Sequence, residues 1–335
     1  MIPVIDNASF AKCRRDRLLN YENYVAKAEN LITRIPNAAK KLSDKDWLRE
    51  SDPGMLLSLT AARFEYALDL LEISYSAGAQ LESLRSAFPE ILSYLEEYAL
   101  YSEKYNQTPE GRINPGPHIA IRDVEFTRAN RLVCFAILLG WVELLPRIMA
   151  IIEYNNDELD GMLERLAAVY VPRSETMPSD CARHLPYYKT LAIFNADLAI
   201  RSTLVRDYLD DWYEASRREP YYESHEKAKR YLGYWSWEAG AITIALKIDD
   251  HTYRDHEFYP GDMVDFGRNV TDRPGNRPVG AALPELRAKA GEASPKDGTW
   301  ESIGIPSQRM NFLAGEELRD LGSPYGLTVW RYVYE

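Results

Sequence analysis

Apolar residues recur at three- and four-residue spacing along most of the first 270 positions, which is the period of an amphipathic helix. The first run comprises Leu18, Tyr21, Val25, Ala28 and Ile32. We expect a helix here that ends at Pro36, because proline lacks an amide hydrogen and its ring collides with the preceding turn. A second helix is predicted to start at Ser51-Asp52-Pro53, where a capping residue precedes a proline, and to end near Gly78.

Further helical patterns lie at residues 81–105, 122–153, 157–169, 180–217, 223–246 and 260–268. The segment 106–118 carries three prolines and two glycines, so it is a loop and a candidate internal boundary. From residue 269 the pattern changes. Residues 300–305 and 327–334 are predicted strands, the second because it is rich in β-branched and aromatic residues.

Hydrophobic residues make up 46% of the chain and charged residues 27%, which is enough to form a sizeable core. Together with the helical periodicity, this predicts a mainly α fold: a multi-helix array with a small C-terminal β-containing appendage. The expected regions are an N-terminal helical part at 1–115, a C-terminal helical part at 116–268 and a mixed tail at 269–335.

The chain has a formal net charge of −11 and a pI of about 5.2. This charge repels nucleic acid and anionic membranes and favours a basic partner. The N-terminus has no basic region followed by an apolar one, and no run reaches about 18 apolar residues, so we expect a cytoplasmic protein without a membrane span. Cys13, Cys134 and Cys181 lie far apart in sequence and are expected to be free thiols.

The common catalytic motifs are absent from the sequence. It contains no P-loop, no dinucleotide-binding glycine fingerprint, no GxSxG elbow and no HExxH helix. We therefore expect a protein that binds a partner rather than an enzyme, with no cofactor and no metal ion.

The chemically richest segment is residues 231–268. If its first half is helical, Glu238 falls on the same apolar face as Trp235 and Ile242. A carboxylate buried there must be paired, hydrogen-bonded or protonated, because an unpaired buried charge is costly. Two roles stay open for Glu238: a structural hydrogen-bond anchor and a catalytic acid.

Histidines and aspartates collect further along the same segment: Asp249, Asp250, His251, Asp255, His256 and Asp262. The two histidines are five residues apart and therefore do not share a helical face. This arrangement favours hydrogen bonds that fix a loop, and a metal site is the alternative. The competing enzyme hypothesis is a metal-dependent hydrolase that uses Glu238, His256 and Asp262.

An acidic stripe is predicted on the helix within 180–217. Its apolar face is formed by Phe194, Leu198, Val205, Leu209 and Trp212. The acidic residues, which are three, four and seven apart, are Asp207, Asp210, Asp211 and Glu214. They form either a solvated face or a docking surface for a basic partner, where such charge accelerates association.

Six short motifs follow one another in the segment 231–268: Tyr234-Trp235, Trp237-Glu238-Ala239, Ile248-Asp249-Asp250, Asp255-His256, Tyr259-Pro260 and Asp262-Met263-Val264. In type and order they resemble the C-terminal signature of the PoNi family. These are immunity proteins that neutralise PoNe (polymorphic nuclease effector) toxins, which are DNases with a restriction-endonuclease-like fold delivered by bacterial secretion systems, type VI secretion among them.

The resemblance implies a helical, cytoplasmic, non-catalytic immunity protein whose partner is such a nuclease. It also implies a structural role for a set of signature residues: Trp235, Glu238, Asp249, Asp250, His256, Tyr259 and Asp262. We expect the toxin-binding residues to be Asp207, Asp210, Asp211 and Glu214. An acidic surface there would imitate the phosphate backbone and occlude the DNA-binding or active-site cleft. A helical adaptor without a toxin is an alternative, and the sequence leaves a homodimer open.

Overall fold

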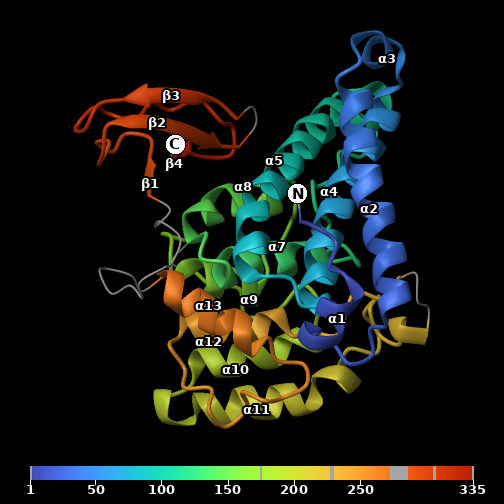
Figure 1. Ribbon diagram of the computed structural model, residues 1–335, viewed down its shortest axis with the longest axis vertical. Coiled ribbons are helices and arrows are strands. Elements are labelled where there is room, and N and C mark those ends of the chain that lie inside the picture. The colour runs from blue at the N-terminus through green and yellow to red at the C-terminus, as the bar shows by residue number, and fades with distance from the viewer. Residues whose placement is uncertain (1, 174–175, 227–229, 272–285, 305–306, 334–335) are drawn as a thin grey trace.

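The computed structural model describes residues 2–173, 176–226, 230–271, 286–304 and 307–333 (Figure 1). The chain is 56% helical, with thirteen α-helices and a four-stranded antiparallel sheet near the C-terminus among the described residues. The predicted mainly α fold with a small β appendage is therefore confirmed. Within the same residues, no helix combines the length and the hydrophobicity needed to cross a bilayer.

The first part of the chain forms three long helices and three short ones. Their bounds are α1 Asn7–Cys13, α2 Tyr21–Leu42, α3 Lys45–Glu50, α4 Pro53–Ala77, α5 Leu81–Asn106 and α6 Pro109–Ile113. The predicted start of α4 is confirmed, since Asp52 caps the helix by accepting from the amides of Gly54 and Met55. Its predicted end is confirmed too, because Gly78 has a φ of 98° that other residues rarely adopt.

The prediction that Pro36 ends the second helix is wrong, because Pro36 lies inside α2. A proline in a helix costs one backbone hydrogen bond and some distortion. The buried face of α2 continues past it, with Ile35 and Ala38 both in the core. Burial of that face stabilises the last turns and offsets the local cost.

The described residues of the second part of the chain contain seven α-helices. They are α7 Phe126–Leu138, α8 Leu145–Glu153, α9 Gly161–Ala168, α10 Thr190–Asn195, α11 Leu198–Ala215, α12 Trp237–Ala245 and α13 Gly261–Thr271. Helix α7 is buried along most of its length and packs against α8, α9, α12 and α13. One hydrophobic core extends from α1 through both helical parts. The division at residues 115 and 268 stays a prediction.

The predicted helix at 223–246 is wrong in its first half. Residues 231–236 have no regular secondary structure, and α12 begins only at Trp237. Residues 227–229 of this prediction lie outside the described residues. Trp235 therefore precedes the helix and does not share a helical face with Glu238, although both side chains are buried.

A long-range contact explains why residues 231–236 are not helical. The Asp16 carboxylate accepts from the Tyr234 amide at 3.1 Å and from the Tyr231 hydroxyl at 2.7 Å. Gly233 between them has a φ of 120°, which a helix excludes. The acceptor is 218 residues away in sequence, so the local periodicity of this segment carried no sign of it.

The C-terminal sheet has the strand order β1-β4-β2-β3, with all pairs antiparallel. Its strands are β1 Arg287–Lys289, β2 Gly298–Ile303, β3 Arg309–Phe312 and β4 Val329–Tyr332. The strands predicted at 300–305 and 327–334 are confirmed as β2 and β4, and residues 305 and 334 lie outside the described residues. A small separate core fills the sheet: Ala288, Trp300, Phe312, Leu318 and Trp330.

A buried ion pair joins the sheet to the helices. Arg147 on α8 donates to both carboxylate oxygens of Glu96 on α5, with Nε···Oε1 at 2.7 Å and Nη2···Oε2 at 2.6 Å. The Nη1 of Arg147 donates to the backbone oxygen of Ile303 at the end of β2. Gly304 lets the strand approach this closely, because a Cβ there would lie 2.1 Å from Arg147 Nη2. One guanidinium thus connects the end of β2 to both α5 and α8.

Candidate partner-binding surface

Helix α11 forms one end of the molecule, opposite the end that carries α3 (Figure 1). Its inner face buries Val205, Tyr208, Leu209 and Trp212 in the core. Its outer face presents the four predicted acidic residues, all exposed: Asp207, Asp210, Asp211 and Glu214. The structure therefore brings these four together on one outward surface, which we call the acidic face.

Few cations neutralise the acidic face. Lys189 donates to Asp211 at 2.6 Å, and Arg206 lies 3.7 Å from Asp207. His256 Nε2 lies 3.5 Å from Asp210, and burial lowers the pKa of His256 below its ordinary value, so it is mostly neutral at pH 7. The three aspartate side chains remain 58–62% exposed, which leaves their charge available to a partner.

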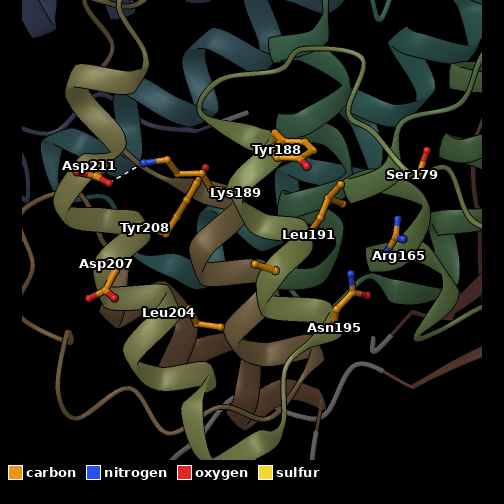
Figure 2. Close-up of a pocket in the computed structure, with 11 residues that line it drawn as sticks. Arg165, Ser179, Tyr188, Lys189, Leu191, Asn195, Leu204, Asp207, Tyr208 and Asp211 are labelled. Carbon is orange, nitrogen blue, oxygen red and sulfur yellow. Dashed lines mark hydrogen bonds and ion pairs between the residues drawn. The ribbon is translucent and has the colours of Figure 1, made fainter.

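A groove of about 620 Å³ runs beside the acidic face, between α10 and α11 (Figure 2). Tyr188, Leu191 and Leu204 supply its apolar surface. Asp207 and Asp211 reach it from α11, and Figure 2 shows Lys189 pointing toward Asp211 across it. We did not predict the groove from the sequence, because its lining comes from four separate parts of the chain and has no periodic signal.

Glu238 at the start of α12 is 1% exposed and holds α11 in place. Its Oε1 accepts from the Tyr208 hydroxyl at 2.7 Å, from Trp212 Nε1 at 2.7 Å and from the Ser236 hydroxyl at 2.8 Å. Its Oε2 accepts from Asn130 Nδ2 on α7 at 3.0 Å. These partners tie three helices together. They belong to α7, α11 and the residue before α12.

The proton of Tyr208 stays on its oxygen in this contact. Burial raises the pKa of Tyr208 well above its ordinary value, and the neighbouring Glu238 carboxylate raises it further. The hydroxyl therefore donates and the carboxylate accepts at neutral pH. Because Tyr208 and Trp212 lie on the inner side of α11, this contact determines which residues face outward.

The other signature residues lie in several separate contacts. Buried Asp250 accepts from the Tyr259 hydroxyl at 3.0 Å and from Arg268 Nη1 at 2.9 Å. Asp262 accepts from the Tyr75 hydroxyl at 2.5 Å and also pairs with Arg15. These bonds connect the loop after α12 to α13, and α13 to α4 and the segment after α1.

Trp235 and Asp249 make two further contacts. Trp235 Nε1 donates to the Ser76 hydroxyl on α4 at 2.9 Å. Asp249 is exposed and binds the backbone amide and the ring of its neighbour His251, and these hydrogen bonds lower the pKa of Asp249. The signature residues thus make several separate contacts, most of which fix α4, α13 and the loops around α12 to one another.

The three residues of the hydrolase hypothesis do not share partners. Glu238 contacts α7 and α11, Asp262 contacts Tyr75 and Arg15, and His256 faces Asp210. Across the described ranges of the chain, no three or more His, Cys, Asp or Glu side chains are grouped so that they could hold a metal ion. The geometry therefore gives this hypothesis no support.

Comparison with known proteins finds one family model that matches part of this chain. Residues 158–263 match the family model of the C-terminal region of PoNe immunity proteins (PoNi). The predicted resemblance is confirmed over this segment, which includes α9 to α12, the acidic face and the signature residues. No curated protein matches the sequence significantly.

One solved structure has a fold similar to that of this chain. The crystal structure of protein PA2201 from Pseudomonas aeruginosa is similar, with a TM-score of 0.64 and 20% sequence identity over 79% of this chain and 95% of that one. At this identity the likeness concerns the fold alone.

Proposed function

We propose that this chain is an immunity protein that binds a cognate antibacterial nuclease toxin in the cytoplasm and occludes its DNA-binding or active-site cleft. The observation that carries the proposal is the match of residues 158–263 to PoNe immunity proteins. The toxin would be a nuclease with a restriction-endonuclease-like fold. In this role the chain needs to bind and need not catalyse.

The acidic face of α11 is the proposed contact surface. A cleft that binds DNA must be basic, and basic side chains that contact phosphates are attracted equally to carboxylates. Each of the acidic residues has others three or four positions away, which is about 4.5–6 Å along the helix axis at 1.5 Å per residue. A rigid row of such charges steers a basic partner into register and raises the association rate.

The groove beside the acidic face supplies an apolar surface next to this charge. Charge pairs at the rim of an interface mainly affect association, whereas buried apolar contacts slow dissociation. Tyr188 is 44% exposed at the groove and is the type of residue that anchors interfaces. We therefore include Tyr188, Leu191 and Leu204 in the proposed contact surface.

The first experiment is co-purification with the product of the adjacent gene, followed by a DNA-cleavage assay with and without this protein. We expect a stable complex and silenced cleavage. A helical adaptor without a toxin would give neither, and that result would refute the immunity proposal as a whole.

The second experiment tests the contact surface by charge reversal. Asp210→Lys with Asp211→Lys should weaken toxin binding at least about tenfold, chiefly through slower association that depends on salt. The matched control is Asp46→Lys with Glu50→Lys on α3, which makes the same charge change at the opposite end of the molecule (Figure 1). Surface plasmon resonance at two salt concentrations measures both rates.

Equal weakening by the two double variants would show that only net charge matters and would refute the acidic face as the contact. Unchanged affinity of the α11 variant would refute it as well. Thermal unfolding of both variants shows whether each remains folded.

A further inference from the structure

The C-terminal sheet has two edges, and they differ in how much the rest of the chain covers them. The strand order places β1 at one edge and β3 at the other, and Figure 1 shows β3 on the side farthest from the helices. At the β1 edge, the Lys289 amide donates to the Glu292 carboxylate at 2.7 Å. Arg287 on the same strand pairs with Glu143 and donates to the Gly140 backbone oxygen. Contacts within the chain therefore protect β1.

The hydrogen bonds between β2 and β3 determine which backbone groups of β3 point away from the sheet. The Ser302 amide donates to the Gln308 backbone oxygen at 2.8 Å, in the register of the two strands. Hydrogen-bonded and non-hydrogen-bonded pairs alternate in an antiparallel ladder. The amides and carbonyl oxygens of Arg309 and Asn311 therefore point outward. Among the residues that the structure describes, these two amides have no partner.

The features that usually keep an edge strand from pairing are weak in β3. Natural edges are protected by proline, lysine, bulges or a covering element. The sequence of β3, RMNF, contains neither proline nor lysine. Its one charged side chain, Arg309, donates through Nε to Glu301 on β2 at 3.1 Å. The Asn311 side chain accepts from the Thr299 hydroxyl on β2 at 2.8 Å, so both side chains are held by neighbours in the sheet.

We propose that the outer edge of β3 pairs antiparallel with β3 of a second copy of this chain, which joins the two sheets into one. The register that fits best places Arg309 opposite Asn311 of the other copy, and Met310 opposite the same residue on the two-fold axis. Each opposed pair of Arg309 and Asn311 then exchanges two backbone hydrogen bonds. The inference does not rest on the proposed immunity function.

The neighbouring registers are less favourable. A shift by two residues in one direction would place Arg309 opposite Arg309, and like charges opposed across two strands destabilise a sheet. A shift by two residues in the other direction would need the Leu313 amide, which already donates to the Glu316 carboxylate at 2.9 Å. The central register avoids both costs and brings together two Met310 side chains, which are partly buried against the small core of the sheet.

The dimensions of β3 determine how strong this contact can be. The strand has four residues, so the interface is small, and we expect a weak dimer that forms at high protein concentration. Helix α11 lies at the opposite end of the molecule from the sheet (Figure 1). Pairing through β3 therefore leaves the acidic face uncovered in both copies.

Sedimentation velocity of the full chain, from about 1 µM to about 1 mM, tests the proposal. The mass should rise from 38.5 kDa toward twice that value. Asn311→Pro removes an outward amide from each copy and leaves the bonds to β2 in place, so it should weaken the dimer at least about tenfold. The matched control is Asn311→Ala, which loses the same side chain but keeps the amide. It should change the affinity less than about threefold.

Met310 tests the register, because each copy would place it opposite itself. Met310→Glu and Met310→Lys should each weaken the dimer, since like charges then meet at the two-fold axis. An equal mixture of the two variants should dimerise more tightly than either variant alone, because opposite charges then meet.

A monomer at every concentration would overturn the proposal. A dimer that Asn311→Pro leaves unchanged would overturn it as well, because the copies would then meet through another surface. A mixture of the Met310 variants that binds no better than either variant would overturn the proposed pairing. Thermal unfolding shows whether each variant is folded. If Asn311→Pro is not, the mixture decides, and if a Met310 variant is not, the two Asn311 variants decide.

Discussion

Two buried carboxylates, one inside the helical body and one where the helices meet the sheet, are stabilised in different ways. In the helical body, Glu238 is surrounded by four neutral donors from three helices. At the contact with the sheet, Glu96 is held by both arms of one arginine, Arg147. A charge shared among several hydrogen bonds loses only part of its support when one partner is removed. A charge held by two hydrogen bonds from one arginine loses both of them when that arginine is removed.

The largest effect should therefore come from Arg147→Met. Glu96 would be left buried without its cation, and the sheet would lose the bond to the Ile303 backbone oxygen. We expect a loss of about 3–5 kcal/mol in the free energy of unfolding, as for other broken buried pairs. Urea denaturation followed by circular dichroism measures it.

The control for Arg147→Met is the double variant that also carries Glu96→Leu. Replacing both partners with apolar side chains removes the uncompensated charge, so most of the lost stability should return. A double variant as unstable as the single one would mean that the contact depends on packing of the arginine rather than on its charge.

The next largest effect concerns pH and His118, at the same contact. His118 is 1% exposed, stacks on Tyr154 with ring centroids 3.8 Å apart, and has Tyr325 at its edge and Glu103 3.6 Å from Nε2. Burial lowers the pKa of His118 to about 4. In the unfolded chain His118 takes up a proton near pH 6.5, whereas in the folded chain it does not until about pH 4. The free energy of unfolding is therefore unaffected by His118 above pH 6.5 and decreases as the pH falls from 6.5 toward 4.

The shift of His118 corresponds to about 3 kcal/mol between pH 7 and pH 4, at 1.36 kcal/mol per pKa unit. His118→Phe keeps the stacking and removes the titration. The free energy of unfolding of the variant, relative to that of the native protein, should therefore rise by about 3 kcal/mol as the pH falls from 7 to 4. His184→Phe, at an exposed ring that stacks on Tyr188, is the matched control. Parallel pH profiles of His118→Phe and the native protein would contradict the prediction.

The smallest of the three effects is expected for Tyr208→Phe. Glu238 would keep three of its four donors, and the lost bond is one to a charged acceptor, worth about 1.5–3 kcal/mol. Tyr188→Phe at the exposed groove is the control and should change stability by less than about 0.5 kcal/mol. A loss for Tyr208→Phe as large as that for Arg147→Met would erase the contrast between the two carboxylates.

Local signals in the sequence were sufficient for the elements whose causes are local. The Asp52 cap, the end at Gly78 and the strand at 327–334 follow from the chemistry of neighbouring residues, and the structure has all three. Pro36 and the segment 231–236 were predicted wrongly because their conformations depend on burial and on partners far along the chain.

The candidate site shows the same limit. The spacing of four acidic residues was enough to place them on one outward face of α11. The partners of Glu238 could not be read from the sequence, because Asn130 lies 108 residues away and Tyr208 lies 30 away. The groove is assembled from separate segments, so only the folded chain reveals it.

The attachment of α11 to a buried carboxylate also bears on how fast a partner can be captured. Tyr208 and Trp212 are held by hydrogen bonds to Glu238 on the inner side of α11. The helix therefore presents its outer side chains in one orientation before it meets a partner. A surface that is already ordered loses little conformational entropy on binding, so less of the interaction free energy is offset. Electrostatic attraction then acts on a fixed target, which is the condition for association rates toward about 10⁸–10⁹ M⁻¹s⁻¹. In the proposed role of capturing a nuclease toxin, that speed would matter as much as the final affinity.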